Sequence, residues 1–258
     1  MAKRKRPHRK KQDLTPPPGD DRLAVLDTLP IADWAYPRVM VAPLLERCIA
    51  HADKVLWPLI SYAQMGAPYL KMGYGRTDFN RNKAAQELLK SDMTHVLMLD
   101  IDHTHPDDLI QRLSKWVLLD DDVWVVGGLN FRRGAPFDPC IYFYGEDDTV
   151  YAPYQWEQGL MECDVLGTGC VLFDRRVFEA IEPPWFTYDY SSVWKNHWPG
   201  EDISFSARCR EAGVKLYADT TVTSPHMIDG KVDESTFRAY HNATNQQVVN
   251  LPPKDVKE

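Results

Sequence analysis

The chain has 258 residues, 44% of them hydrophobic and 11% aromatic, which is typical of a globular protein with a buried core and excludes a disordered chain. Its formal net charge is −7, and its five cysteines form no C-x-x-C pair, which argues against a disulfide framework or a zinc knuckle. Because no apolar run approaches the roughly 18 residues of a membrane span and the first residues lack a signal peptide's apolar segment, we expect no membrane insertion and a cytoplasmic location.

Positive charge is concentrated at the N-terminus. Residues 1–11, MAKRKRPHRKK, contain seven Lys and Arg and no acidic residue, which leaves the rest of the chain acidic. Such a tail either tethers nucleic acid or only solubilises the protein. The prolines and glycine of residues 16–19 oppose a regular element, so we predict that residues 1–35 are a flexible, basic leader.

From residue 36 onward, short apolar runs alternate with amphipathic stretches, which is typical of an α/β layer architecture. We predict strands at 38–44, 67–74, 95–102, 122–129 and 214–220, a strand running into a helix over 169–181, and β or irregular chain over 138–165. We predict helices at 47–65, 79–92, 106–119 and 201–213. This order predicts one domain over residues 36–230, with a mostly parallel central sheet flanked by helices, and a polar C-terminal extension over 231–258.

Two aspartates follow an apolar run at the end of the strand predicted at 95–102. In a strand, Asp100 and Asp102 project from the same face, because side chains alternate with a period of two. Two carboxylates so close together repel each other unless a cation lies beside them, and a divalent cation with oxygen ligands also neutralises a bound diphosphate. Since ligands of open α/β sheets bind at the C-terminal ends of the strands, this D-x-D segment is a candidate metal site.

Two hydrolase chemistries compete for the same segment. The run Asp100, Asp102, Thr104 resembles the first motif of haloacid-dehalogenase-type phosphatases, although His105 and Pro106 replace the usual apolar continuation and no convincing later G-D-x-x-x-D follows. A metallohydrolase of the H-x-H-x-D-H kind needs its histidines before the aspartate, and here the order is reversed. The phosphatase therefore stays open as an alternative.

From residue 37 to residue 227 the chain resembles GT-A glycosyltransferases of the family 2 type, especially the small forms of bacteriophages and bacteria. The resemblance rests on landmarks in a fixed order: VMVAPLLER, RNKAAQELL, LDIDHTHPDDLIQRL, VVGGLNFRR with CDVLGTGCVLFDRRVFEAI, GEDISFSARCREAG and TSPHM. It implies a single GT-A, Rossmann-like domain. It also implies a hexosyltransferase that uses Mn²⁺ or Mg²⁺ to move a sugar from a nucleoside diphosphate sugar, expected to be a UDP-sugar, to an acceptor hydroxyl.

The resemblance also implies roles for individual residues. The implied metal ligands are Asp102, Asp100 and His226, and the implied base is Asp202, supported by Glu201, with inversion at the transferred sugar. The remaining implied contacts are Pro43, Leu44, Glu46, Arg81, Asn82 and Asp100 with the donor, and Gly128, Gly167, Thr168, Gly169 and Trp198 with the sugar or the acceptor.

Several of these residues also have structural explanations. Acidic residues such as Glu201 and Asp202 are favoured at any helix start by the helix dipole, and glycines serve tight connections as well as close approach to a ligand. Arg132 and Arg133 either hold phosphate or form a solvated pair. His103 and His105 are expected to shape the turn or line the pocket rather than bind the metal.

The acceptor is the least defined part of the prediction. The basic tail favours a hydroxymethylated base in phage DNA, which places the enzyme in the host cytoplasm and requires a flipped or exposed base. A glycan, a protein or a small molecule remains open as the acceptor. A catalytically inactive module that binds nucleotide sugars or nucleic acid is the alternative to an enzyme. The oligomeric state is not predicted.

Overall fold

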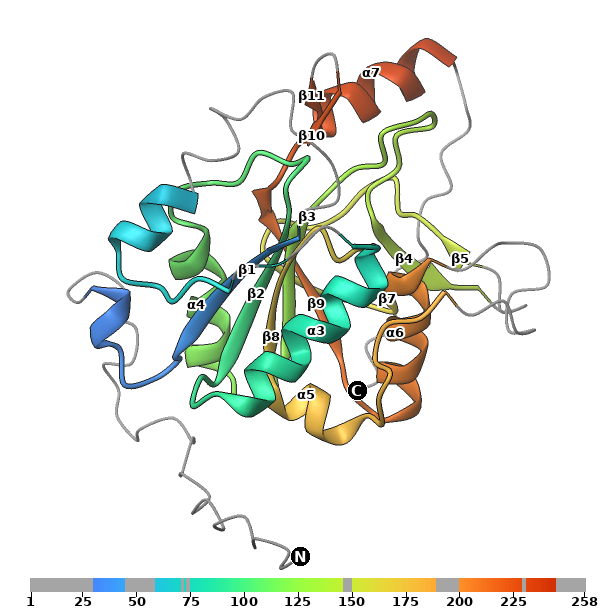
Figure 1. Ribbon diagram of the computed structural model, residues 1–258. Helices are drawn as coiled ribbons and strands as arrows, with labels where there is room; N and C mark the ends of the chain where they lie inside the picture. Colours follow the sequence, from blue (N-terminus) through green and yellow to red (C-terminus); the bar gives the residue numbers. More distant parts are fainter. Residues whose placement is uncertain are drawn as a thin grey trace, which may run out of the picture.

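The computed structural model describes residues 30–44, 59–70, 72, 75–145, 150–188, 200–228 and 231–244 (Figure 1). Among the predicted features, the basic segment 1–11, Glu46 and Trp198 lie outside these residues.

A six-stranded sheet forms the centre of the molecule (Figure 1). Its spatial order is β1 (Val39–Leu44), β2 (His95–Asp100), β8 (Cys170–Asp174), β3 (Val125–Leu129), β9 (Leu216–Thr223) and β6 (Leu160–Cys163). The pairs β1–β2 and β3–β9 are parallel, whereas β8 runs antiparallel to both of its neighbours and β6 runs antiparallel to β9.

The predicted α/β class with a central sheet flanked by helices is confirmed. The sheet is mixed, however, because three of its five pairings are antiparallel although four of the six strands share one direction. Apolar patterning predicts that a segment is a strand, but it carries no information on the direction in which the chain re-enters the sheet.

Two apolar layers cover the two faces of the sheet. On β2, Val96 and Met98 pack in the same cluster as Ala84 and Leu88 of α3 (Thr77–Lys90). The intervening residues Leu97 and Leu99 pack in the other cluster with Leu109, Leu113 and Val117 of α4 (Leu109–Leu119). The first layer also contains α5 (Arg175–Ala180) and α6 (Glu201–Glu211), which lie beside α3 in front of the sheet in Figure 1.

Two predicted elements differ from the structure. The strand predicted at 67–74 is reduced to one bridge, in which Val41 hydrogen bonds with the backbone of Pro68 and Leu70 on either side of Tyr69; residues 71, 73 and 74 are not described. Within the helix predicted at 47–65, residues 59–64 are helical and residues 47–58 lie outside the described chain.

Residues 231–244 belong to the folded body. After β10 (His226–Met227), the strand β11 (Lys231–Val232) and the helix α7 (Glu234–Thr244) fall within the predicted polar extension. Val232 and Phe237 are buried in the core, so the fold continues to residue 244. In the sequence, the only indication of this packing is the presence of these isolated apolar residues in a polar stretch.

Smaller elements complete the described chain. The 3₁₀ turn η1 (Ile31–Asp33) brings Ile31 and Trp34 of the predicted leader into the second apolar layer. Strands β4 (Ile141–Tyr144), β5 (Val150–Tyr151) and β7 (Val165–Leu166) form a second, three-stranded sheet within the region predicted as β or irregular. Over the residues that the structure describes, none of the helices combines the length and apolar character needed to cross a membrane.

Candidate active site

The loops that leave β2 and β9 meet at the C-terminal edge of the sheet. His103 and His226 form an antiparallel bridge, the Met227 N–H donates to the Asp102 carbonyl at 2.7 Å, and the Thr104 N–H donates to the Pro225 carbonyl at 3.0 Å. These backbone hydrogen bonds fix the residues that follow one strand against those that follow the other.

Asp102, His103 and His226 form a candidate metal site, which we call the metal-ligand group. The carboxylate oxygen and ring nitrogens that these residues offer to a metal lie within 4.8 Å of one another. Asp102 Oδ1 lies 3.2 Å from His103 Nδ1 and 3.7 Å from His226 Nε2, and the two imidazole rings are 3.7 Å apart between centroids. One carboxylate with two imidazoles is a donor set that suits Mn²⁺ and other first-row divalent cations, and it admits Mg²⁺ less readily.

The hydrogen bond of His226 supports a role as a ligand. Its Nδ1 lies 2.6 Å from the carbonyl oxygen of Phe131, which can only accept, so Nδ1 carries the proton of the neutral ring. Burial and the nearby His103 lower the pKa of His226 to about 4, which keeps the ring neutral at pH 7. The lone pair of Nε2 therefore faces Asp102 and can bind a cation. Histidines that bind metals commonly donate the hydrogen of their other ring nitrogen to a carbonyl in this way.

The structure places His103 beside Asp102 and His226, whereas the sequence-based prediction assigned it to the turn or the pocket lining rather than to the metal. The side chain is 1% exposed; its Nδ1 lies 3.2 Å from Asp102 Oδ1, whereas its Nε2 has no hydrogen-bond partner among the described residues. A buried imidazole that contacts a carboxylate through Nδ1 and leaves Nε2 without a described partner is a candidate metal ligand. Burial raises the pKa of Asp102, but the hydrogen bond from His103 and the charges of His103, His226 and Arg133 lower it by more. The pKa of Asp102 therefore lies well below its usual range.

His105 connects the end of β2 to the chain after β9. Its Nε2 donates to the Asp100 carbonyl at 2.9 Å, which leaves Nδ1 to accept from the Ser224 hydroxyl at 3.1 Å. Burial and the charge of His103 lower the pKa of His105 to about 3, so the ring is neutral and its two nitrogens are occupied.

Asp100 is held by Arg81 and lies outside the three-residue group. Arg81 Nη2 donates to both Asp100 carboxylate oxygens at 3.0 and 3.2 Å, Nη1 donates to the Thr168 carbonyl at 2.8 Å, and Nε donates to Glu201 at 3.3 Å. The predicted metal ligand Asp100 and the predicted nucleotide contact Arg81 thus form a buried network that connects β2, α3, the loop before β8 and α6.

We expect Arg81→Leu to lower the free energy of unfolding by about 3–5 kcal/mol, because the substitution leaves Asp100 and Glu201 without their buried partner. Urea denaturation measures the change. Arg76→Leu is the matched control, since Arg76 pairs with Asp78 on the surface and its side chain is 67% exposed. Equal effects of the two substitutions would contradict the account of the network.

Glu201 and Asp202 begin α6 with different electrostatic environments. Burial raises the pKa of Glu201, but the charge of Arg81 and hydrogen bonds that include the Thr77 and Tyr188 hydroxyls outweigh burial, so the pKa is lowered. Burial and the adjacent Glu201 carboxylate raise the pKa of Asp202 to about 6. Glu201 is therefore a fixed anion, whereas Asp202 exchanges a proton near neutral pH, as a general base requires.

Asn82 does not have the predicted donor-binding geometry. Its Nδ2 donates to the carbonyls of Asp78 and Phe186, and its Oδ1 accepts from the N–H groups of Trp185 and Phe186. The amide has therefore used its hydrogen-bonding groups to attach the chain at 185–186 to α3.

The predicted glycines serve close packing. A Cβ at Gly167 would lie 2.5 Å from the Cys140 Cβ, one at Gly128 would lie 3.0 Å from a Val222 methyl, and one at Gly169 would lie 2.9 Å from the His103 ring. Of the three, Gly169 adjoins the metal-ligand group and makes room for His103.

The remaining predicted residues vary in their contribution. Pro43 is buried in β1 beside Leu99, and Leu44 ends that strand beside Asp100. Thr168 is buried beside Gly169, with its hydroxyl lacking a described partner. Asn130 was missed; it is 3% exposed, neither side-chain amide atom has a partner among the described residues, and its Nδ2 lies 3.1 Å from the position of a Gly169 Cβ. Asn130 lies in the landmark VVGGLNFRR, but the motif does not predict its burial beside Gly169.

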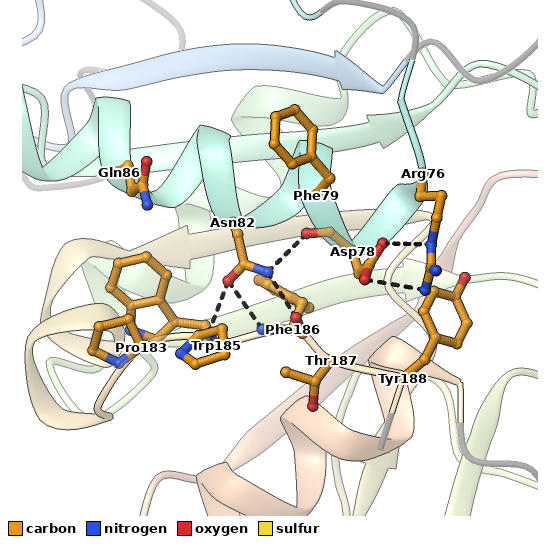
Figure 2. A pocket seen from close by; sticks show the side chains of 11 residues that line it. Arg76, Asp78, Phe79, Asn82, Gln86, Pro183, Trp185, Phe186, Thr187 and Tyr188 are labelled. Carbon is orange, nitrogen blue, oxygen red and sulfur yellow. Dashed lines mark hydrogen bonds and ion pairs between the residues drawn. The ribbon is translucent and has the colours of Figure 1, made fainter. Parts of the chain in front are cut away.

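A pocket of about 700 Å³ lies between α3 and residues 183–188 (Figure 2). Figure 2 shows Asp78 and Asn82 pointing from α3 toward this segment. The Tyr188 hydroxyl lies 2.7 Å from the Thr77 hydroxyl, and both side chains hydrogen bond with Glu201. The pocket was not predicted from the sequence, and its lining residue Tyr188 connects it to Glu201 at the start of α6.

Comparison with known proteins gives limited similarity. No family model matches the chain, and no curated protein matches it in sequence. Among solved structures, A197 from STIV is 19% identical, with 74% of this chain and 85% of that chain covered and a TM-score of 0.46. GalNAc-T7 with UDP, GalNAc and Mn²⁺ is 12% identical, with 80% of this chain and 42% of that chain covered and a TM-score of 0.47. The chain thus spans less than half the length of GalNAc-T7, and we base the function on the geometry of its own residues.

Proposed function

We propose that the protein is a metal-dependent glycosyltransferase that moves a hexose from a UDP-sugar to an acceptor hydroxyl. The observation that carries the proposal is that the chain has both the metal-ligand group and, in Asp202, a carboxylate whose pKa is raised. Arg81 connects the two, since it binds Asp100, two residues before Asp102, and Glu201, next to Asp202.

The roles of the side chains follow from their environments. Asp102, His103 and His226 would hold Mn²⁺ or Mg²⁺, which when bound supplies a Lewis acid for the diphosphate charge. Asp202 takes the proton of the acceptor hydroxyl as its oxygen bonds to the sugar's anomeric carbon and the bond to the diphosphate breaks on the opposite face. This in-line displacement predicts one inversion. Burial and the negative charge of Glu201, which Arg81 holds in place, raise the pKa of Asp202 to about 6.

The phosphatase alternative has less support. Its nucleophile would be Asp100, but both oxygens of that carboxylate accept hydrogen bonds from the buried Arg81 guanidinium. A carboxylate paired in this way is a poor nucleophile, because its charge is already stabilised.

The pocket between α3 and residues 183–188 is our candidate acceptor site. Its lining includes Arg76, but Asp78 neutralises that charge through contacts of 3.2 and 3.3 Å. A neutral acceptor with hydroxyl groups suits this lining better than a phosphate backbone does. A hydroxymethylated DNA base would therefore depend on the basic segment 1–11 for its phosphate contacts.

A panel of nucleotide sugars tests the proposed function. With Mn²⁺ present, we expect one UDP-sugar to raise the melting temperature and to be hydrolysed slowly without an acceptor. A phosphatase would instead release phosphate from simple esters without any need for a sugar nucleotide, and an inactive module would bind a donor without hydrolysing it. If no nucleotide sugar binds, the proposed function is wrong.

Transfer assays then identify the acceptor. Oligosaccharides are compared with hydroxymethylated and plain DNA duplexes, using the full chain and a variant that lacks residues 1–11. The neutral pocket predicts transfer to an oligosaccharide that is unaffected by the deletion. Transfer to hydroxymethylated DNA that requires residues 1–11 would contradict the acceptor assignment but support the glycosyltransferase.

A further inference from the structure

Arg132 and Arg133 are adjacent in the chain but have different electrostatic partners. Arg133 Nη1 lies 2.9 Å from Asp102 Oδ2, whereas the charge of Arg132 acts on Asp138. The Arg133 side chain is nevertheless 51% exposed, so its ion pair with Asp102 is open to solvent on one side. The structure therefore separates two residues that the sequence left equivalent.

A short hairpin over residues 130–140 positions Arg133 beside the metal-ligand group. The Cys140 N–H donates to the Asn130 carbonyl at 2.8 Å, and the Arg132 N–H donates to the Asp138 carbonyl at 2.9 Å. Phe137, on the same hairpin, makes an edge contact with Tyr240 of α7, with ring centroids 5.6 Å apart. The backbone at Arg133 is thus fixed, while its long side chain can reach more than one anion.

A cation at the metal-ligand group and the Arg133 guanidinium compete for the same carboxylate. The group shares Asp102 with Arg133, whose Nη1 contacts the second carboxylate oxygen. Two positive charges on one carboxylate repel each other, so cation binding favours an Arg133 that has moved to a new anion. A diphosphate held beside that cation is such an anion, and its oxygens match the planar fork of a guanidinium.

We propose that Arg133 neutralises Asp102 when no divalent cation is bound and binds the diphosphate of the donor when one is. This inference rests on the proposed function, because it takes a nucleoside diphosphate as the ligand. It assigns Arg133 two successive anions, Asp102 and the diphosphate. Loss of the Arg133 side chain should therefore lower the Kd for the divalent cation and raise the Kd for the nucleoside diphosphate.

The test is a pair of titrations on the full chain. For Arg133→Ala, we expect the Kd for Mn²⁺ alone, followed by electron paramagnetic resonance of the free ion, to fall by about 3- to 10-fold as a competing charge disappears. In saturating Mn²⁺, we expect the Kd for UDP, measured by calorimetry, to rise by about 10-fold or more as a charge-assisted contact is lost. Arg133→Lys keeps the charge and should give an intermediate Kd for UDP.

Arg132→Ala is the matched control and should leave both constants unchanged. A higher Kd for Mn²⁺ in Arg133→Ala would mean that Arg133 orients Asp102 instead of competing for it, and an unchanged Kd for UDP would remove its role at the diphosphate. Either result overturns the inference without touching the glycosyltransferase. If the wild-type chain binds Mn²⁺ but no UDP, the proposed function fails, and the Mn²⁺ titration still decides whether Arg133 competes.

Discussion

Replacement of Asp202 by Asn is expected to lower kcat for sugar transfer by about 1,000-fold, because the amide cannot accept the proton of the acceptor hydroxyl. Donor binding should change little, since the substitution keeps the shape of the side chain. Glu211→Gln is the matched control, as Glu211 lies exposed at the other end of α6. Transfer at the wild-type rate by Asp202→Asn would show that another group is the base.

The same residue predicts the pH dependence of transfer. The pKa of Asp202 is raised to about 6 by burial and by Glu201, and the base must be deprotonated to act. Activity should therefore rise with pH through about 6 and fall below it. Replacement of Glu201 by Gln removes the neighbouring negative charge, so the midpoint should move to lower pH; a midpoint that stays near 6 would exclude Glu201 as the cause.

The second large effect is expected at His226. Because this histidine presents the lone pair of Nε2 to the metal-ligand group, His226→Ala should raise the Kd for Mn²⁺ by about 100-fold or more. Transfer at limiting Mn²⁺ should fall in proportion. A titration of Mn²⁺ against the folded variant measures the change directly.

His241→Ala is the control for this loss of affinity. His241 lies in α7 and packs against Phe237, with ring centroids 4.4 Å apart, outside the metal-ligand group. Its removal should leave the Kd for Mn²⁺ unchanged. If both histidine variants bind Mn²⁺ as tightly as the wild type, the ion is held elsewhere.

The positions of the central strands could be predicted from the sequence because a strand that is buried on both faces consists of a short, continuous run of apolar residues. HVLMLD and VVGGL are buried on both faces, and they form β2 and β3 where the patterning indicated. The direction of β8 could not be predicted, since it depends on how the chain returns after the hairpin and the second sheet. The same limitation applies to Phe237, whose burial depends on α7 folding back onto the core.

The predicted ligand set, Asp102, Asp100 and His226, differs from the metal-ligand group for a local reason. The prediction extended the strand to Asp102, which places Asp100 and Asp102 on one face. The strand ends at Asp100, and the turn at 101–102 instead directs Asp100 to Arg81 and brings His103 within 3.2 Å of Asp102. A difference of two residues in the strand end thus changed the predicted ligand set.

Other features of the site arise only from tertiary contacts. His226 entered the prediction through the order of the landmarks, but its tautomer depends on the Phe131 carbonyl, 95 residues away in the chain. Asn82 lies in the predicted helix, yet its amide binds a segment more than 100 residues away. Neither partner can be read from the sequence around these residues.

The central claim is that Asp102, His103 and His226 hold the cation of a nucleotide-sugar site. Anomalous diffraction at the manganese absorption edge, from crystals grown with Mn²⁺ and UDP, tests it most directly. We predict one strong peak at about 2.0–2.3 Å from one ligand atom of each of the three residues, with the UDP diphosphate beside it. A manganese peak elsewhere, or UDP bound away from this group, would contradict the account.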